Sequence, residues 1–310
     1  MRWHLVTPEW PPFAGGVATW AREMAGALSE AGEEVTVHAR DGTPPAIRMR
    51  GRSWARWGAV WAAASVLPRL RSGDRILCAT WEMAPLLLGR APLAVVWHGS
   101  DITRPPRRSG RARVIAGAVN LPVSRYLGGL LGAPHTVLPA PIDPVAPATR
   151  GEALLVVARL GALKGVDRAL RLARRLGRPI TVVGDGPERA ALEGLARELG
   201  ARARFTGALP RHEIPWEGTW ALVLLSRPDA DGSGQEGLGL VLLEAHARGI
   251  PTIGSTTGGI PEVASVVLAD PEHDPVPTLP HADAVRARLR AEHGRARAVA
   301  VLRASLADRG

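Results

Sequence analysis

Short apolar segments alternate with amphipathic helical segments twice along this 310-residue chain, and no other feature restricts the fold more. In an α/β protein this alternation is typical of parallel strands joined by helices that cover both faces of a sheet. In the first half we expect a helix at 17–31 and strands at 3–7, 34–39, 76–79, 93–97, 120–123 and 136–138. In the second half we expect helices at 165–176, 187–199 and 240–248 and strands at 153–158, 180–183, 203–205, 221–225 and 251–254.

A proline-rich segment separates the two halves. Residues 139–149 contain four prolines and show no helical period, which is typical of a domain connection. We therefore predict an N-terminal domain at 1–140, a linker at 141–150, a C-terminal domain at 151–282 and a helical tail at 283–310. Two doubly wound, Rossmann-like domains of this kind are expected to face an interdomain cleft, because ligands bind at the carboxyl ends of their strands.

Composition restricts the environment and the partners. With 46% hydrophobic and 22% charged residues, the chain can form a core and is not expected to be disordered. The single cysteine, Cys78, excludes a disulfide within the chain, and no apolar run has the length of a membrane span. We expect a cytoplasmic protein. Its net charge of +10 suits an anionic membrane surface, an anionic substrate or nucleic acid.

The stretch 227–262 contains the strongest candidate site. Glu236 precedes an apolar helix that follows Gly237 and Gly239, and Glu244 lies inside that helix. A helix start without bulky side chains offers unpaired N–H groups, which suit a phosphate. The two carboxylates suit hydroxyl groups instead, such as those of a ribose and a sugar. The stretch therefore indicates a pocket for a nucleotide sugar.

Two cations flank the loop that follows the first strand of the second half. Arg159 and Lys164 are placed to neutralise a leaving diphosphate. A solvated turn is the alternative, but cations near a helix start oppose the helix dipole, which favours the functional interpretation. Further along, Gly184 and Gly186 resemble half of a dinucleotide fingerprint, although Pro187 alone explains a turn there.

The first half offers weaker signals. Gly15 and Gly16 follow the first strand and fit either a simple turn or a close approach to a phosphate or sugar. His98 ends a buried strand, where it caps a turn or contacts a reacting sugar. Arginines between 48 and 56 alternate with Trp54, Trp57 and Trp61, a pattern that fits core packing or an anionic membrane surface. A second basic run covers 104–113.

Taken together, these motifs resemble the retaining glycosyltransferases of family 4, which have the GT-B fold. The resemblance covers nearly the whole chain, and its motifs occur in the family order. They are the glycine pair at 15–16, HGSD at 98–101, SRYL at 124–127, ARLGALKG at 158–165, VVGDGPE at 182–188, FTGALP at 205–210, EGLGLVLLEAHARGIP at 236–251 and GGIPE at 258–262.

The resemblance implies roles for individual positions. Arg159 and Lys164 would hold the donor diphosphate, Glu236 the donor sugar and Glu244 the ribose. His98 would lie close to the transferred sugar. The remaining donor-binding positions would be Gly15, Gly16, Gly184, Gly186, Leu209, Gly239 and Leu240, and acceptor contacts would come from Asp101 and Arg104. The resemblance implies no cofactor and no bound metal.

We therefore predict a retaining glycosyltransferase that transfers a sugar from a UDP- or GDP-linked donor to an acceptor hydroxyl. The favoured acceptor is an anionic glycolipid or a surface-polysaccharide precursor, because the N-terminal domain is basic; a small molecule is the other option. Peripheral contact with the inner face of the cell membrane fits this prediction. One alternative is a sugar-nucleotide epimerase or hydrolase on the same fold. Another is a non-catalytic, basic nucleic-acid-binding protein, although no known nucleic-acid-binding motif supports it.

Overall fold

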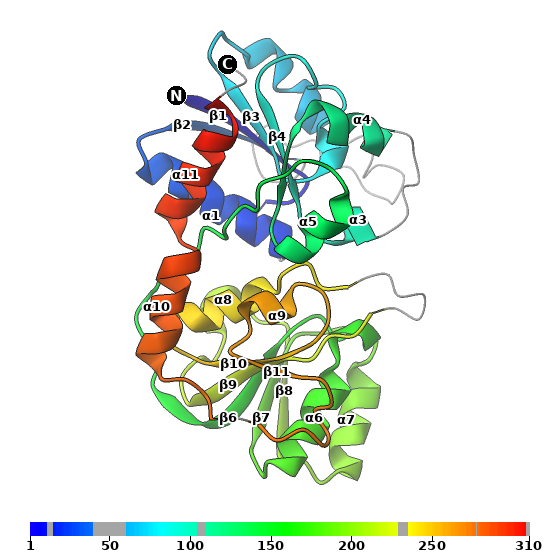
Figure 1. The fold of residues 1–310 in the computed structure, drawn as a ribbon. Helices are drawn as coiled ribbons and strands as arrows, with labels where there is room; N and C mark the ends of the chain where they lie inside the picture. Colours follow the sequence, from blue (N-terminus) through cyan, green and yellow to red (C-terminus); the bar gives the residue numbers. More distant parts are fainter. Residues whose placement is uncertain (11–14, 40–59, 104–109, 229–234, 277, 308–310) are drawn as a thin grey trace. The chain divides into compact units, whose positions relative to one another are not determined.

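The computed structural model describes residues 1–10, 15–39, 60–103, 110–228, 235–276 and 278–307 (Figure 1). The chain divides into two compact units. Unit 1 consists of Met1–Pro141 together with His293–Gly310, and unit 2 consists of Ile142–Glu292.

Unit 1 contains a parallel five-stranded sheet in the order β2-β1-β3-β4-β5. Its strands are β1 (Arg2–Thr7), β2 (Glu34–Ala39), β3 (Arg75–Cys78), β4 (Leu93–Trp97) and β5 (Val119–Pro122). Its helices are α1 (Gly16–Glu30), α3 (Ser100–Thr103), α4 (Gly110–Gly117), α5 (Arg125–Leu131) and α11 (Arg295–Ser305), with short 3-10 turns η1 (Leu67–Arg69) and η2 (Trp81–Met83).

The helix that follows the first strand of unit 1 forms as the sequence predicts. Trp20, Met24 and Leu28 are four residues apart, so they lie on one face of α1, and all three are buried. Gly32 ends the helix segment with a φ of 77°, which a glycine adopts without strain. Helix and strand thus share one core.

A buried chain of polar side chains joins the first three strands of unit 1. His4 Nδ1 lies 2.9 Å from His38 Nε2, and His4 Nε2 lies 3.0 Å from an Asp74 carboxylate oxygen. Arg2 donates to the same carboxylate, and His38 Nδ1 lies 2.7 Å from the Ser65 hydroxyl. Because each of these groups is partnered, the sheet can bury them without leaving an uncompensated charge.

The end of the chain returns to unit 1. Helix α11 lies beside α1 (Figure 1), and Arg295 forms ion pairs with Glu23 and Glu30. Arg303 pairs with Glu33, whose carboxylate also binds the N-terminal amino group of Met1.

Unit 2 contains a parallel six-stranded sheet in the order β11-β10-β9-β6-β7-β8. Its strands are β6 (Arg150–Val157), β7 (Ile180–Val183), β8 (Ala203–Gly207), β9 (Thr219–Leu224), β10 (Thr252–Ser255) and β11 (Val266–Leu268). Its helices are α6 (Val166–Arg175), α7 (Arg189–Glu198), α8 (Leu240–Ala247), α9 (Ile260–Val263) and α10 (Ala282–Glu292), with 3-10 turns η3 (Ala162–Lys164) and η4 (Arg211–Glu213).

The predicted fold class is confirmed, and three local predictions differ from the structure. Residues 136–138 are not a strand: Thr136 and Leu138 each donate one backbone hydrogen bond to the β5 segment, and the prolines at 139 and 141 cannot continue the ladder. The short edge strand β11 was not predicted. The described part of the predicted helical tail contains two helices, α10 in unit 2 and α11 in unit 1, and Gly294 is the N-cap of α11.

No helix among the described residues combines the length and apolar character needed to cross a membrane.

The stability of unit 1 is expected to fall on mild acidification. Burial and the neighbouring charges of His4 and Arg69 lower the pKa of His38 from 6.5 to about 4. The unfolded chain therefore binds this proton more readily than the folded chain. The contribution of neutral His38 to the free energy of unfolding is fully present above pH 6.5 and is lost as the pH falls toward 4. We expect the free energy of unfolding to be lower by roughly 2 kcal/mol at pH 5 than at pH 7.5 from this group. Denaturant titrations at both pH values measure the difference. A His38→Asn variant should show a smaller pH dependence; an unchanged dependence would contradict the assignment.

Candidate active site

The order of the strands in unit 2 identifies where a ligand is expected. The chain leaves β6 toward β7 on one side, and returns later to place β9 on the other side of β6. In doubly wound sheets, ligands bind at the carboxyl ends of the two strands where this reversal occurs. The loops after β6 and β9 carry the charged residues predicted from the sequence.

The loop after β6 is built on one glycine with a strict requirement. Gly165 has φ 60° and ψ 33°, and a side-chain carbon at this position would lie 1.9 Å from the Leu225 carbonyl oxygen. The loop and the segment after β9 are joined by the Arg227 amide, which donates to the Leu163 carbonyl at 2.8 Å. This close packing fixes Lys164 beside the end of β9, whereas Arg159 is exposed at the start of the loop.

An ion pair connects the two loops. Lys164 Nζ donates to Glu236 Oε2 at 2.5 Å, and the Ser226 hydroxyl lies 3.5 Å from the same oxygen. The Lys164 side chain is 34% exposed and that of Glu236 is 19% exposed, so the pair lies at the surface of the unit where a ligand can reach it. A cation and a carboxylate thus lie together at the edge of the sheet.

The second glycine turn holds the backbone of Glu236. The Gly259 amide donates to the Glu236 carbonyl oxygen at 3.0 Å. A side-chain carbon on Gly258, which has a φ of 60°, would lie 2.1 Å from that oxygen. The motif GGIPE therefore packs directly against the carboxylate-bearing loop.

Helix α8 begins at Leu240, four residues after Glu236. Gly239 is its N-cap, with a φ of 82°, and no side chain caps the helix. The amides of the first turn, which begins at Leu240, are of the kind that a phosphate can bind. Glu244 lies in the same helix, is 8% exposed, and forms an ion pair with Arg211 at 3.1 Å.

The glycines after β7 pack against the loop after β6. A side-chain carbon on Gly184 would lie 1.8 Å from the Ala158 carbonyl oxygen, and one on Gly186 would lie 2.2 Å from that of Leu160. Both amides are also engaged, Gly184 with the Gly207 carbonyl and Gly186 with the Asp185 side chain. Close packing thus accounts for both glycines, and Leu209 is half-buried in the loop after β8.

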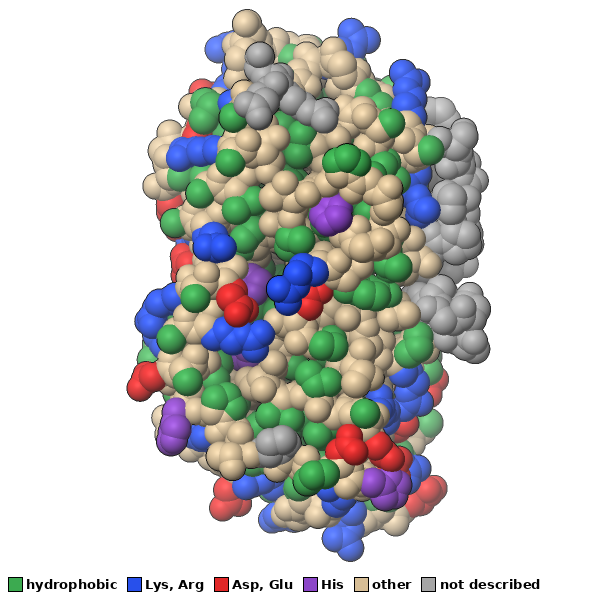
Figure 2. Space-filling view, in the orientation of Figure 1, with side chains coloured by type: hydrophobic (Ala, Val, Ile, Leu, Met, Phe, Trp, Pro, Cys, Tyr) green, Lys and Arg blue, Asp and Glu red, His purple; other side chains and the backbone are tan. Residues whose placement is uncertain are grey.

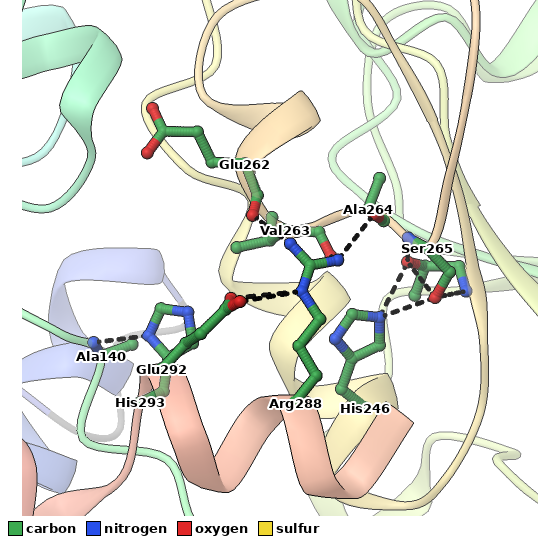
Figure 3. A network of polar contacts seen from close by, with 10 residues as sticks. Ala140, His246, Glu262, Val263, Ala264, Ser265, Arg288, Glu292 and His293 are labelled. Atoms are coloured by element: carbon green, nitrogen blue, oxygen red, sulfur yellow. Dashed lines mark hydrogen bonds and ion pairs between the residues drawn. The ribbon is translucent and has the colours of Figure 1, made fainter. Parts of the chain in front are cut away.

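Helix α10 supports the glycine turn through one arginine (Figure 3). Arg288 donates to the carbonyl oxygens of Glu262 at 2.6 Å and Ala264 at 3.1 Å, where α9 ends. Its Nε lies 3.2 Å from both carboxylate oxygens of Glu292. The last turn of α10 therefore fixes the segment that packs against Glu236.

The candidate residues of unit 1 follow β1 and β4. The Asp101 carboxylate accepts hydrogen bonds from the amides of His98 and Gly99, so it shapes this turn. The His98 ring packs against Trp20, and burial lowers the pKa of His98 to about 4, which keeps it neutral at neutral pH. Among the described residues, its Nε2 is buried without a hydrogen-bond partner.

The remaining predicted residues of unit 1 are Gly15, Gly16 and Arg104. Gly15 is the extended N-cap of α1, and a side-chain carbon there would lie 2.6 Å from a Glu9 carboxylate oxygen. Gly16 begins the helix, and Arg104 lies outside the described residues. That the sites of unit 1 and unit 2 form one cleft stays a prediction.

Two contacts of the site were not anticipated from the sequence. Arg211 pairs with Glu244, and Arg288 caps α9, yet each lies outside the motifs quoted above. No local pattern marks them, because both act on segments far away in the sequence. No group of three or more metal-binding side chains lies close together in the described ranges.

Residues 143–266 match the model of a family described as Glycosyl transferases group 1. A GDP-mannose-dependent alpha-(1-6)-phosphatidylinositol monomannoside mannosyltransferase of Mycobacterium tuberculosis is 27% identical, covering 83% of this chain and 81% of that protein. A 2-deoxystreptamine glucosyltransferase of Streptomyces kanamyceticus is 37% identical over 37% of this chain and 30% of its own length.

Solved structures resemble the whole chain. AviGT4, a glycosyltransferase involved in avilamycin A biosynthesis, superposes with a TM-score of 0.74 at 20% identity and covers 99% of this chain and 98% of its own. Anabaena HepE in complex with UDP and glucose gives a TM-score of 0.65 at 16% identity, covering 97% and 96%.

The two parallel-sheet units and these matches define the chain as a glycosyltransferase with the GT-B fold. More specifically, the residues of unit 2 that match the model of the family Glycosyl transferases group 1, 143–266, include the Lys164–Glu236 pair.

We expect the loop after β6 to tolerate a side chain at one glycine and not at another. Gly165→Ala should lower the free energy of unfolding by more than about 2 kcal/mol for two reasons. Alanine is strained in the left-handed backbone conformation of this residue, and its side-chain carbon would collide with the Leu225 carbonyl oxygen. Gly161→Ala is the matched control: its φ is −129° and nothing lies within 4 Å of the added carbon. It should change stability by less than about 1 kcal/mol. Equal melting temperatures for the two variants would contradict the observed loop geometry.

Proposed function

We propose that the protein is a metal-independent, retaining glycosyltransferase of family 4 that transfers a sugar from a nucleoside diphosphate to an acceptor hydroxyl. The observation that carries this proposal is the Lys164–Glu236 ion pair beside the start of α8. It combines a cation for a diphosphate, the amides of a helix start for a phosphate and a carboxylate for sugar hydroxyls at the carboxyl edge of the sheet.

Each side chain has a distinct task in the proposed reaction. The acceptor oxygen bonds to the anomeric carbon while the bond from that carbon to the diphosphate oxygen breaks, and the diphosphate leaves with the electron pair. The acceptor proton passes to the leaving phosphate, and attack on the face of departure retains the configuration. Lys164 and Arg159 stabilise the charge that develops on the diphosphate. Glu236 orients the sugar hydroxyls and Glu244 the ribose.

The relative matched over most of the chain supports a choice of donor and acceptor. The name of that relative gives GDP-mannose as donor and a phosphatidylinositol monomannoside as acceptor. We accordingly propose a guanosine-linked sugar as donor and an anionic glycolipid as acceptor, with the enzyme acting in the cytoplasm at the inner face of the membrane. A small-molecule acceptor is the second candidate, favoured by the partial match to a 2-deoxystreptamine glucosyltransferase.

The alternatives predict different products and surfaces. A hydrolase or epimerase would form free sugar or an altered nucleotide sugar, whereas a transferase forms a glycoside. A nucleic-acid-binding protein would be expected to gather its cations in one patch. On the face drawn in Figure 2, lysine and arginine side chains are scattered over the described surface of each unit, with acidic side chains between them.

Loss of either member of the ion pair should abolish transfer. We expect Lys164→Ala and Glu236→Ala to reduce kcat/KM by at least about 100-fold, because each removes an interaction with the reacting donor. The assay is glycoside formation from a panel of GDP- and UDP-linked sugars with glycolipid and aminocyclitol acceptors. His212→Gln is the control, since this side chain is 82% exposed in unit 2. Turnover near the wild-type rate in either ion-pair variant would reject the role of that residue.

A membrane-facing surface is also proposed for unit 1. Val60, Trp61 and Leu67 are 40%, 57% and 38% exposed, and the nearby Arg69 and Arg71 are exposed as well. Apolar side chains beside cations suit the headgroup region of an anionic membrane. The other tryptophans of the predicted stripe, Trp54 and Trp57, lie outside the described residues.

Flotation with liposomes tests this surface. We expect recovery with vesicles containing anionic lipid to exceed recovery with neutral vesicles, and Trp61→Ala to lower it at least twofold, because tryptophan favours the membrane interface. Leu130→Ala removes a comparably exposed apolar side chain, 49% exposed, from α5 of the same unit and should leave recovery unchanged. Equal recovery of wild type with both vesicle types would reject the surface.

A further inference from the structure

The turn after β8 places an arginine against the carboxylate of α8. Arg211 is the first residue of η4, the 3-10 turn that lies between β8 and β9. Its Nη2 lies 3.1 Å from Glu244 Oε1, and the two side chains are 29% and 10% exposed. The pair therefore lies mostly inside unit 2, with the guanidinium partly at the surface.

Glu244 occupies a position that disfavours an isolated charge. It is 8% exposed, and its neighbours Leu242, Leu243 and Ala245 in α8 are buried. A carboxylate that loses contact with water in such a place requires a cation and hydrogen-bond donors. Arg211 supplies both.

The other nearby arginine is committed elsewhere. Arg248 Nη1 donates to the backbone carbonyl oxygen of Glu244 at 2.9 Å, and its guanidinium stacks over the Trp216 ring, 4.5 Å from the ring centroid. Burial lowers the pKa of Arg248, and the charge of Arg211 acts in the same direction. Arg248 thus binds the backbone at the end of α8, while Arg211 forms the ion pair with the Glu244 carboxylate.

We propose that Arg211 is a positioning residue that holds the Glu244 carboxylate in the orientation in which it binds the two hydroxyls of the donor ribose; this inference rests on the proposed function. A carboxylate has about four acceptor sites, so it can bind one guanidinium nitrogen and two hydroxyls together. A planar guanidinium restricts the rotation of the carboxylate, which lowers the entropic cost of ordering it when the nucleotide binds.

The proposal requires that the effect of Arg211 depends on the ribose hydroxyls. The test is calorimetric titration of the full chain with GDP and UDP and with their 2′,3′-dideoxy forms. For the nucleotide that wild type binds, Arg211→Gln should weaken binding by about tenfold or more, the size expected for a charged hydrogen bond. For the dideoxy form, the same substitution should change the dissociation constant less than about twofold. Arg211→Lys should recover part of the loss.

Two further variants sharpen the result. In a Glu244→Gln background, adding Arg211→Gln should cause little further loss, because the two residues act on the same hydroxyls. His212→Gln changes the next residue of the same turn and should bind like wild type, since that side chain is 82% exposed.

The outcomes separate the two proposals. If Arg211→Gln weakens both nucleotide forms equally, or weakens neither, the positioning role is overturned while the nucleotide site stands. If wild type binds neither GDP nor UDP, the proposed function fails, and the inference fails with it. A selective loss for the ribonucleotide supports the inference, and the retained dideoxy binding shows that the variant is folded.

Discussion

Parallel strands deliver every following loop to one edge of a sheet, and the Lys164–Glu236 ion pair is the contact that this constraint produces in unit 2. The two residues are far apart in the sequence, and they meet because β6 and β9 are neighbours. Around this contact the remaining parts are arranged by close backbone packing. At Gly165 and Gly258 the backbone passes so close to a carbonyl oxygen that any residue with a side-chain carbon would collide with it.

The loop that carries Glu236 is supported from the far end of the chain. The Glu236 carbonyl oxygen accepts a hydrogen bond from the Gly259 amide. Helix α9 follows Gly259, and Arg288 donates hydrogen bonds to the carbonyl oxygens at its end. Arg288 in turn contacts Glu292, the last residue of α10, and the next residue, His293, accepts a hydrogen bond from the Ala140 amide in unit 1. Figure 3 shows both sets of contacts: Arg288 holds the end of α9 within unit 2, and His293 binds the Ala140 amide within unit 1.

Local pattern predicted the elements well and their mutual contacts poorly. The strands at 93–97 and 180–183 and the start of α8 at Leu240 follow directly from apolar runs and glycine turns, because these are determined by adjacent residues. The segment 136–138 also has an apolar pattern, but its backbone donates two hydrogen bonds to β5, and the prolines at 139 and 141 that follow it cannot extend the ladder. Arg211 and Arg288 could not be identified, since nothing near them in the sequence shows which carboxylate or carbonyl groups they reach. The resemblance to a known family supplied the roles that geometry alone leaves open.

The identity of the cation in the central pair follows from the same physical argument. Lys164 is the only lysine among 39 basic residues, so the composition of the chain favours arginine at every basic position. Arg227 shows what arginine does here: one of its guanidinium nitrogens contacts both oxygens of Asp167, at 2.7 and 2.6 Å, and stays committed to them. An ammonium group is a compact point charge on a flexible stem, and Lys164 contacts a single oxygen of Glu236. In the proposed reaction, such a group would turn from the carboxylate to the diphosphate while Glu236 binds the sugar, a change of partner that a forked guanidinium would hinder.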